Sequence, residues 1–287
     1  AFGVTPSRGR HWRAGSAVPW FGVASIVAGR APGMPPGAVL QLTQRIQHAA
    51  AAGTIIDIAG LAPHRAVADQ YRYLEFLDTA EVIENGLKAQ AEGYDAFLIG
   101  NFFQPGLHEL RELLTIPVLG LAESSVSMAC LMGPTFSLIQ VNPKFNRRIL
   151  EGIAVQGLAG RMTSVEMLTV ERPGSFDIAL QNPDVRDGIV QQFAETARRA
   201  LDRGAEVLIP AGGSLMAVLL QAGVQDIDGA PVLDGITALV KTGEMAVQMK
   251  ALTGSFTSKR LTYAPPRGKI LADARASYGA HIYPGVD

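Results

Sequence analysis

Two apolar stretches of the sequence end in residues that could contact a reacting carbonyl group. The first, Tyr94–Asn101, ends in an asparagine, whose amide can donate a hydrogen bond to a developing oxyanion. The second, Ala205–Gly212, is followed by Gly213 and Ser214, and the backbone N–H groups of such a turn at a helix start can bind a carboxylate or an oxyanion. Each end also has a simpler interpretation, because asparagine and glycine are both common turn residues.

Proton transfer next to such a carbonyl needs a titratable side chain, and two candidates follow predicted strands. Glu123 ends a central strand at a helix N-terminus, although the helix dipole alone also favours an acidic residue there. His64 is the only histidine in a loop after an early strand, although a lone histidine is more often an ordinary surface residue. Both side chains can act as general acid or base.

Further polar residues near the predicted strand ends could bind a substrate, but each also has an ordinary structural role. A lysine can hold a carboxylate or be solvated. A serine at a helix start can present its N–H group to a ligand or cap the helix. A tyrosine can line a pocket or pack. These residues are Ser124, Ser125, Asn142, Lys144, Tyr71 and Tyr73.

The order of the predicted elements indicates an α/β fold. Short apolar runs alternate with amphipathic helical segments, which is typical of parallel sheets covered by helices. Tyr94–Asn101 resembles Ala205–Gly212, and segment 116–120 resembles segment 230–235, at an offset of about 111 to 114 residues. Such a repeat predicts two similar lobes, which we assign to residues 1–114 with 225–287 and to residues 115–224. Residues 255–287 are predicted to form an extended tail.

The composition and net charge indicate which kinds of molecule this protein is expected to bind. The chain has 287 residues, 48% of them hydrophobic and 18% charged, and a formal net charge of -1. Nucleic acids and anionic membranes need a concentrated basic face, so neither is expected as a partner. We expect a cytoplasmic homo-oligomer that acts on a small molecule. The single cysteine, Cys130, excludes an intramolecular disulfide and a cysteine-based zinc site, and its apolar neighbours predict a buried, inert thiol.

Four segments carry a resemblance to a known family: Asp95–Leu107, Ile116–Ser124, Gly204–Leu215 and Pro231–Glu244. They resemble the aspartate/glutamate/hydantoin racemase superfamily, nearest to its hydantoin racemases, with arylmalonate decarboxylase and maleate isomerase as relatives. The resemblance implies two pseudo-symmetric flavodoxin-like lobes with the active site in the cleft between them. It also implies proton transfer, without a redox cofactor, at a carbon next to a carbonyl. For two-base members it implies a cysteine at the end of each repeated strand.

The chain differs from this pattern at both cysteine positions. Asn101 stands at the first position, and Ala211 or Gly212 stands at the second. None of these side chains can accept a proton near neutral pH. The sequence therefore predicts a thiol-free, cofactor-independent enzyme acting on a small carboxylate, cyclic amide or imide, or lactone, as an isomerase, a decarboxylase or a ring-opening hydrolase. The alternative is a catalytically silent homologue that binds a small acid.

Combining the residues with the resemblance gives a predicted site. We predict Asn101 as the partner of the carbonyl or oxyanion, and Glu123 or His64 as the group that handles the proton. No metal or cofactor is expected. The residues predicted to bind substrate are Phe102, Ser124, Ser125, Asn142, Lys144, Ala211, Gly212, Gly213, Ser214, Tyr71 and Tyr73.

Overall fold

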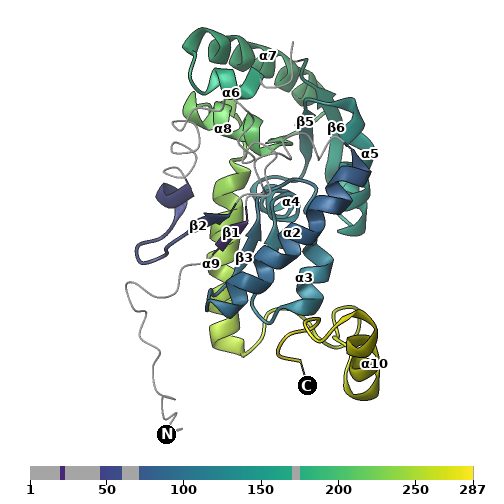
Figure 1. The fold of residues 1–287 in the computed structure, drawn as a ribbon. Helices are drawn as coiled ribbons and strands as arrows, with labels where there is room; N and C mark the ends of the chain where they lie inside the picture. Colours follow the sequence, from purple (N-terminus) through teal and green to yellow (C-terminus); the bar gives the residue numbers. More distant parts are fainter. Residues whose placement is uncertain (1–19, 23–45, 60–70, 170–174, 287) are drawn as a thin grey trace, which may run out of the picture.

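Four parallel strands form the first sheet. The computed structural model describes residues 20–22, 46–59, 71–169 and 175–286 (Figure 1). The strand order is β2 (Asp57–Ala59), β1 (Trp20–Gly22), β3 (Phe97–Ile99) and β4 (Val118–Gly120), and each neighbouring pair is parallel. β3 and β4 carry no polar side chain and are buried throughout, as strands covered on both faces must be.

The second sheet has three parallel strands, in the order β6 (Met162–Met167), β5 (Phe136–Gln140) and β7 (Val207–Pro210). A separate antiparallel pair consists of β8 (Asp226–Ile227) and β9 (Ala230–Pro231). The two similar stretches of sequence thus lie in different sheets, because the first contains β3 and the second contains β7. The predicted α/β class, with parallel sheets in two lobes, is confirmed.

Helices follow most of the strands, and several begin at a recognisable capping residue. Asn142 and Asn182 each precede a proline and accept hydrogen bonds from backbone N–H groups of the first turn, and Asp234 does the same without a proline. The helices are α2 (Arg72–Ala91), α3 (Leu107–Leu113), α4 (Leu121–Met132), α5 (Pro143–Val155), α6 (Ser175–Ala179), α7 (Pro183–Asp202), α8 (Gly213–Gln221), α9 (Gly235–Thr253) and α10 (Gly268–Tyr278), with a 3₁₀ turn η2 (Ala159–Arg161).

One hydrophobic cluster joins the two sheets. It contains Leu98 and Leu119 from the first sheet and Leu138 from the second, together with the facing sides of α4 and α9. α9 can approach closely because two glycines face its neighbours. A methyl group added to Gly235 would overlap the Oγ of Ser125, and one added to Gly243 would lie 2.9 Å from a methyl group of Leu98. The lobes therefore share a core.

The strand pairing places the division between the sheets later than predicted. β4 pairs with β3, so the first sheet runs on to residue 120, although we assigned residues 115–224 to the second lobe. A parallel bridge between Leu208 and Val232 also keeps segment 226–232 beside the second sheet. A strand's sheet is decided by its partner, and a local pattern does not reveal that partner. The assignment of whole lobes otherwise stays a prediction.

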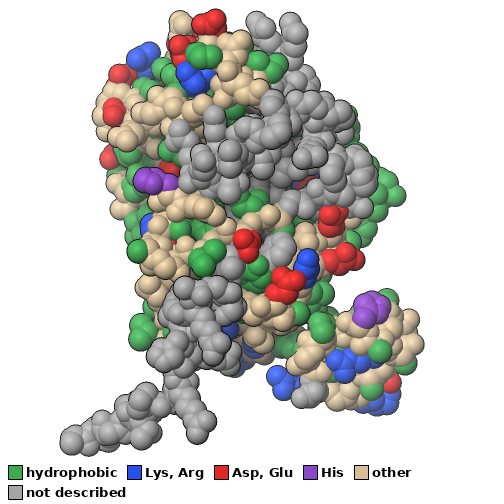
Figure 2. Space-filling model, turned by 60° about the vertical axis from the view of Figure 1, so that its left-hand side comes forward, with side chains coloured by type: hydrophobic (Ala, Val, Ile, Leu, Met, Phe, Trp, Pro, Cys, Tyr) green, Lys and Arg blue, Asp and Glu red, His purple; other side chains and the backbone are tan. Residues whose placement is uncertain are grey.

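Two further segments differ from the prediction. The pattern of the sequence predicts a helix from Thr79 to Glu92 after a polar, aromatic segment, but α2 already begins at Arg72, so Tyr73 lies in α2. The C-terminal segment is not an extended tail, because it contains α10, which begins shortly after Pro265 and Pro266. Prolines end one element but also permit a helix to start just beyond them. Figures 1 and 2 show the C-terminal segment projecting from the main body. Among the described residues, no helix combines the length and the apolar character needed to cross a bilayer.

Candidate functional site

The carboxyl ends of β3 and β7 meet between the two sheets. A methyl group added to Gly213 would lie 3.6 Å from the carbonyl oxygen of Gly100, so the two backbones are separated by little more than van der Waals contact. Asn101 follows Gly100, and Gly212 precedes Gly213. The fold therefore brings together two predicted positions that lie more than a hundred residues apart in the sequence.

Asn101 is buried, with 7% of its surface exposed. Its Oδ1 accepts a hydrogen bond of 2.7 Å from the backbone N–H of Phe103. This bond orients the carboxamide, and no residue in the described ranges accepts a hydrogen bond from Nδ2. Asn101 therefore stabilises the turn through Oδ1, while its Nδ2 has no acceptor among the described residues. Phe102 packs into the hydrophobic core with 6% exposure.

On the opposite side, Ala211 continues β7, and its N–H donates to the carbonyl of Ile139 at 2.8 Å. α8 begins at Gly213, and Gly212 precedes it without a capping side chain. The first N–H groups of a helix have no partner inside the helix. Gly213 and Ser214, which are half-buried, thus present donors on the side where Gly100 approaches.

Glu123 has a structural partner that the sequence did not reveal. Its carboxylate forms an ion pair with Arg111 of α3, and both side chains are largely buried. The same oxygen, Oε1, accepts a hydrogen bond of 3.1 Å from the N–H of Gly120. The N–H of Glu123 donates to Oε1 of Gln104 at 2.8 Å. These hydrogen bonds connect the start of α4 to the loop after β3. Of the two carboxylate oxygens of Glu123, Oε2 forms no hydrogen bond within the described residues.

Buried polar atoms without partners occur at the start of α4, which follows β4, and at the end of β5. The Oγ atoms of Ser124 and Ser125, at the start of α4, are buried and form no hydrogen bond with any described residue. Gln140 is fully buried at the carboxyl end of β5, and neither its Oε1 nor its Nε2 has a partner among the described residues. The sequence analysis did not select Gln140. Its signal was a polar residue ending an apolar strand, Phe136–Gln140.

The remaining predicted residues lie farther out. Asn142 caps α5, and its Oδ1 accepts from the N–H of Lys144 at 3.0 Å. The Nζ of Lys144 lies 4.4 Å from the ring centroid of Tyr71, so these two residues meet although they come from different lobes. Tyr71 and Tyr73 are 49% and 71% exposed. His64 lies outside the described residues.

Both the sequence and the fold of this chain match known proteins. The model of the Asp/Glu/hydantoin racemase family matches residues 32–243. This chain belongs to that family. It is 30% identical over 247 residues to a hydantoin racemase from Pseudomonas sp. (strain NS671), covering 85% of this chain and 94% of that protein.

Two solved structures share the racemase family fold with this chain. Allantoin racemase from Klebsiella pneumoniae superimposes with a TM-score of 0.69 at 22% identity, covering 88% of this chain and 95% of that one. An arylmalonate decarboxylase mutant gives a TM-score of 0.52 at 13% identity, covering 81% and 93%. At these identities the likeness concerns the fold alone.

Cys130, the only cysteine of this racemase family member, lies in the last turn of α4. The predicted family cysteine positions, Asn101 and Ala211 or Gly212, follow strands whose ends meet. The correspondence of these positions to the family thiols stays a prediction.

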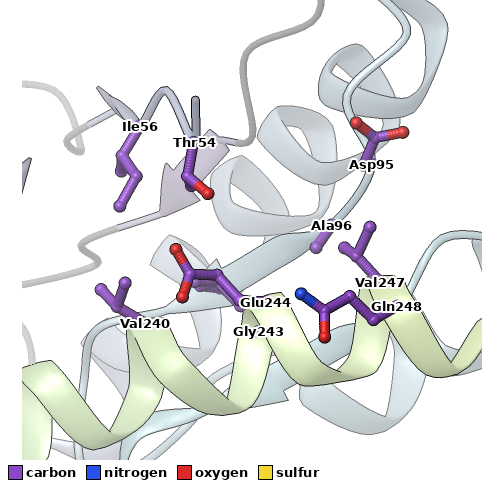
Figure 3. Close-up of a pocket in the computed structure, with 10 residues that line it drawn as sticks. Thr54, Ile56, Asp95, Ala96, Val240, Gly243, Glu244, Val247 and Gln248 are labelled. Carbon is purple, nitrogen blue, oxygen red and sulfur yellow. The ribbon is translucent and has the colours of Figure 1, made fainter. Parts of the chain in front are cut away.

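A pocket at the other end of the first sheet is separate from the strand carboxyl ends. It lies at the amino ends of β2 and β3, against α9, and Figure 3 shows the carboxylate of Glu244 facing Thr54 across it. Burial raises the pKa of Glu244, but hydrogen bonds from the Ala51 N–H and from Lys241 and Thr54 outweigh it, so the pKa is lowered overall. This carboxylate ties the Ala51 turn to α9. No cluster of three His, Cys, Asp or Glu side chains suited to a metal occurs in the described part of the chain.

Proposed function

We propose that this chain is an isomerase that inverts the configuration of a carbon next to a carbonyl in a small cyclic amide of the hydantoin type. The observation that carries the proposal is the buried Asn101, whose Nδ2 has no acceptor within the described ranges, at the point where the strand ends of the two lobes meet. The similarity to a hydantoin racemase over nearly its whole length supports the reaction class. The relatives named here give no support to the hydrolase or lactone chemistry that the sequence left open, and the decarboxylase likeness concerns only the fold.

The proposed reaction needs little more than proton transfer and charge stabilisation. A base removes the proton from the carbon, and the electron pair moves onto the neighbouring carbonyl oxygen. A water molecule on the other face then returns a proton to the carbon, and the base releases its proton to solvent. Asn101 Nδ2 would donate to the oxygen as its charge develops, and the first N–H groups of α8 would face it from the second lobe. Neither group titrates, so both are available at any working pH.

The group that moves the proton is proposed to be Glu123 or His64. Glu123 holds Arg111 and the Gly120 N–H through Oε1, which leaves Oε2 for proton transfer. His64 has the chemistry of a general base near neutral pH. The variants Glu123→Gln and His64→Asn separate the two, because losing general acid–base assistance typically lowers the rate by about 10²–10⁴.

We propose that the carboxamide of Gln140, buried at the carboxyl end of β5, binds the substrate, which would favour a cyclic amide over a free carboxylate. Its Nε2 is a donor and its Oε1 an acceptor, and neither has a partner among the described residues. The –CO–NH– edge of a ring offers an acceptor and a donor side by side, so it can satisfy both atoms at once. A carboxylate offers acceptors only and would leave Oε1 unpaired, at a cost of about 1–3 kcal/mol.

Isotope exchange tests the proposed reaction directly. A single enantiomer of a 5-alkylhydantoin is incubated with the protein in D₂O, with a protein-free sample as the control for spontaneous exchange. We expect loss of the C5 proton signal in NMR together with appearance of the other enantiomer on chiral chromatography. Asn101→Ala should lower the rate by about 10²–10³, as for other oxyanion donors. Ring-opened product or released carbon dioxide would contradict the proposal.

A second test addresses substrate recognition. Gln140→Met keeps the volume but removes both unpaired polar atoms, so we expect unchanged or higher stability, since a buried unsatisfied group is costly. KM for the hydantoin should rise about tenfold, which corresponds to about 1.4 kcal/mol of lost binding. Lower stability with an unchanged KM would mean that the Gln140 amide serves the fold and not the substrate.

The second candidate function is a silent homologue that binds a small molecule. It is favoured by the side chains at Asn101, Ala211 and Gly212, none of which can take a proton. Calorimetry would then show saturable binding of a cyclic amide or small acid, while the C5 proton of a bound hydantoin exchanges no faster than in the protein-free control.

A further inference from the structure

Helix α2 of the first lobe and helix α5 of the second lobe face each other through two ion pairs. Arg148 contacts Glu75, and only 11% and 16% of these two side chains are exposed. Arg72 lies 3.0 Å from Glu151, and this pair is 64% and 48% exposed. Hydrogen bonds from Arg72 and Arg147 lower the pKa of Glu151. One largely buried ion pair and one exposed ion pair thus link α2 to α5, in addition to the shared core.

The buried pair also touches the loop that carries Asn101. The guanidinium carbon of Arg148 lies 3.8 Å from the ring centroid of Phe103, close enough for a cation–π contact. Phe145 of α5 meets the same ring edge-on, with centroids 4.9 Å apart. Arg148 and Phe145 of the second lobe therefore both contact the ring of Phe103, a residue of the first lobe. We call Glu75, Arg148 and Phe103 the interlobe clasp.

Phe103 links the clasp to the proposed site through its backbone. Its N–H is the group that donates to Oδ1 of Asn101. If Phe103 shifts, this bond is lost, the carboxamide can rotate, and Nδ2 is no longer directed by the backbone. An open cavity of about 330 Å³, lined by Arg72, Thr79 and the clasp among others, lies beside these groups. Arg148 lines this cavity, and its contacts with Glu75 and Phe103 hold the guanidinium at the cavity wall.

We propose that Arg148 is a positioning residue: from the second lobe it fixes Phe103, and through Phe103 it fixes the carboxamide of Asn101. This inference rests on the proposed function, in which Asn101 Nδ2 donates to the developing oxyanion. The site is then complete only when α5 lies against α2. A displacement of about 1 Å at a reacting centre can lower a rate by about 10², so loosening the clasp should lower kcat and change KM little.

The matched variants are Arg148→Met and Glu151→Gln. Both break one ion pair between the same two helices, but only Arg148 touches Phe103. The pair of Glu151 is exposed, and such pairs contribute little. We expect Arg148→Met to lower kcat about 10- to 100-fold with KM within about threefold, and Glu151→Gln to match the parent protein. A raised KM with unchanged kcat, or an equal loss in both variants, would overturn the proposal.

A second readout does not depend on activity. With ¹⁵N-labelled asparagine, the side-chain NH₂ signals of Asn101 are identified by their absence in Asn101→Ala. We expect these signals to shift or broaden in Arg148→Met and to stay in place in Glu151→Gln. If they stay in place in a folded Arg148→Met protein, the positioning role is wrong. If they move but no variant exchanges the hydantoin proton, the proposed function fails while the positioning role stands.

Arg148→Lys covers the case in which Arg148→Met does not fold. Lysine keeps a positive charge beside Glu75 but has no planar group to stack on Phe103. The Asn101 signals should therefore move in this variant too, although the ion pair is retained. Unchanged signals in a folded Arg148→Lys protein would overturn the role of the stacked guanidinium.

Discussion

At the residue scale, the position of Cys130 predicts a structural thiol and not a reactive one. A helix rises about 1.5 Å per residue, so Cys130 lies about 14 Å along α4 from Leu121, away from the strand ends. Its side chain is half-buried and not fully buried as its apolar neighbours predicted, because it packs at the margin of the main hydrophobic cluster. Its carbonyl accepts a hydrogen bond of 3.1 Å from Arg161, which also binds Gly133 and so completes the end of the helix.

Replacing this thiol should therefore affect stability only. Cys130→Ala keeps the backbone carbonyl that Arg161 binds, and it removes one half-buried sulfur atom. We expect a loss of at most about 1 kcal/mol in the free energy of unfolding and an unchanged rate of hydantoin exchange. Alkylation of the parent protein with iodoacetamide is the complementary measurement. Complete loss of exchange in a folded Cys130→Ala protein would restore a thiol mechanism.

At the element scale, the C-terminal segment is held to α3 by a few polar contacts. Lys259 donates to the carbonyls of Arg111 and Glu112, Tyr263 Oη lies 2.8 Å from Nδ1 of His108, and Tyr283 donates to Glu112 at 2.6 Å. In α10 only Leu271 is buried. The segment therefore depends on hydrogen bonds more than on a core of its own.

The tyrosine contact should make this docking sensitive to alkaline pH. The hydrogen bond to Glu112, together with burial, raises the pKa of Tyr283 from 10.0 to about 12. The stabilisation is complete below the unfolded value near 10 and is lost as the pH rises through about 12. Absorbance at 295 nm should show a late-titrating tyrosine that is absent in Tyr283→Phe. Identical titrations of the two proteins would show that Tyr283 is not held in this way.

At the scale of the whole molecule, the shared core predicts one unfolding unit. Leu239 of α9 is fully buried in the cluster that also holds side chains of both sheets. Truncation of such a leucine typically costs about 2–5 kcal/mol. Because the cluster belongs to both lobes, Leu239→Ala should destabilise both lobes together. Whether the protein forms a homo-oligomer stays a prediction.

Two optical probes test this cooperativity. Both tryptophans, Trp12 and Trp20, are in the N-terminal part of the chain, whereas far-UV circular dichroism reports helices of both lobes. We expect the two signals to follow one urea transition in the parent and in Leu239→Ala, with the midpoint lowered in the variant. Separate fluorescence and dichroism transitions would show that the lobes unfold independently.

The sequence by itself determined the features that depend on local pattern. Alternating apolar runs and amphipathic segments predicted the α/β class, and the similarity of Tyr94–Asn101 to Ala205–Gly212 predicted strands in two sheets. Four short segments were enough to show the family. The glycines within one of them, Gly235 and Gly243, are explained by the close approach of α9 to its neighbours. Asn101 was selected from its place at a strand end, and its Nδ2 has no acceptor among the residues that the structure describes.

Only the tertiary structure decided which groups meet. β4 belongs to the first sheet because it pairs with β3, and Glu123 is tied to Arg111, a partner on another helix. The stacking of Arg148 on Phe103 has no local signature either. Periodicity records which face of an element is buried, whereas a hydrogen bond or an ion pair depends on what the rest of the chain places opposite that face.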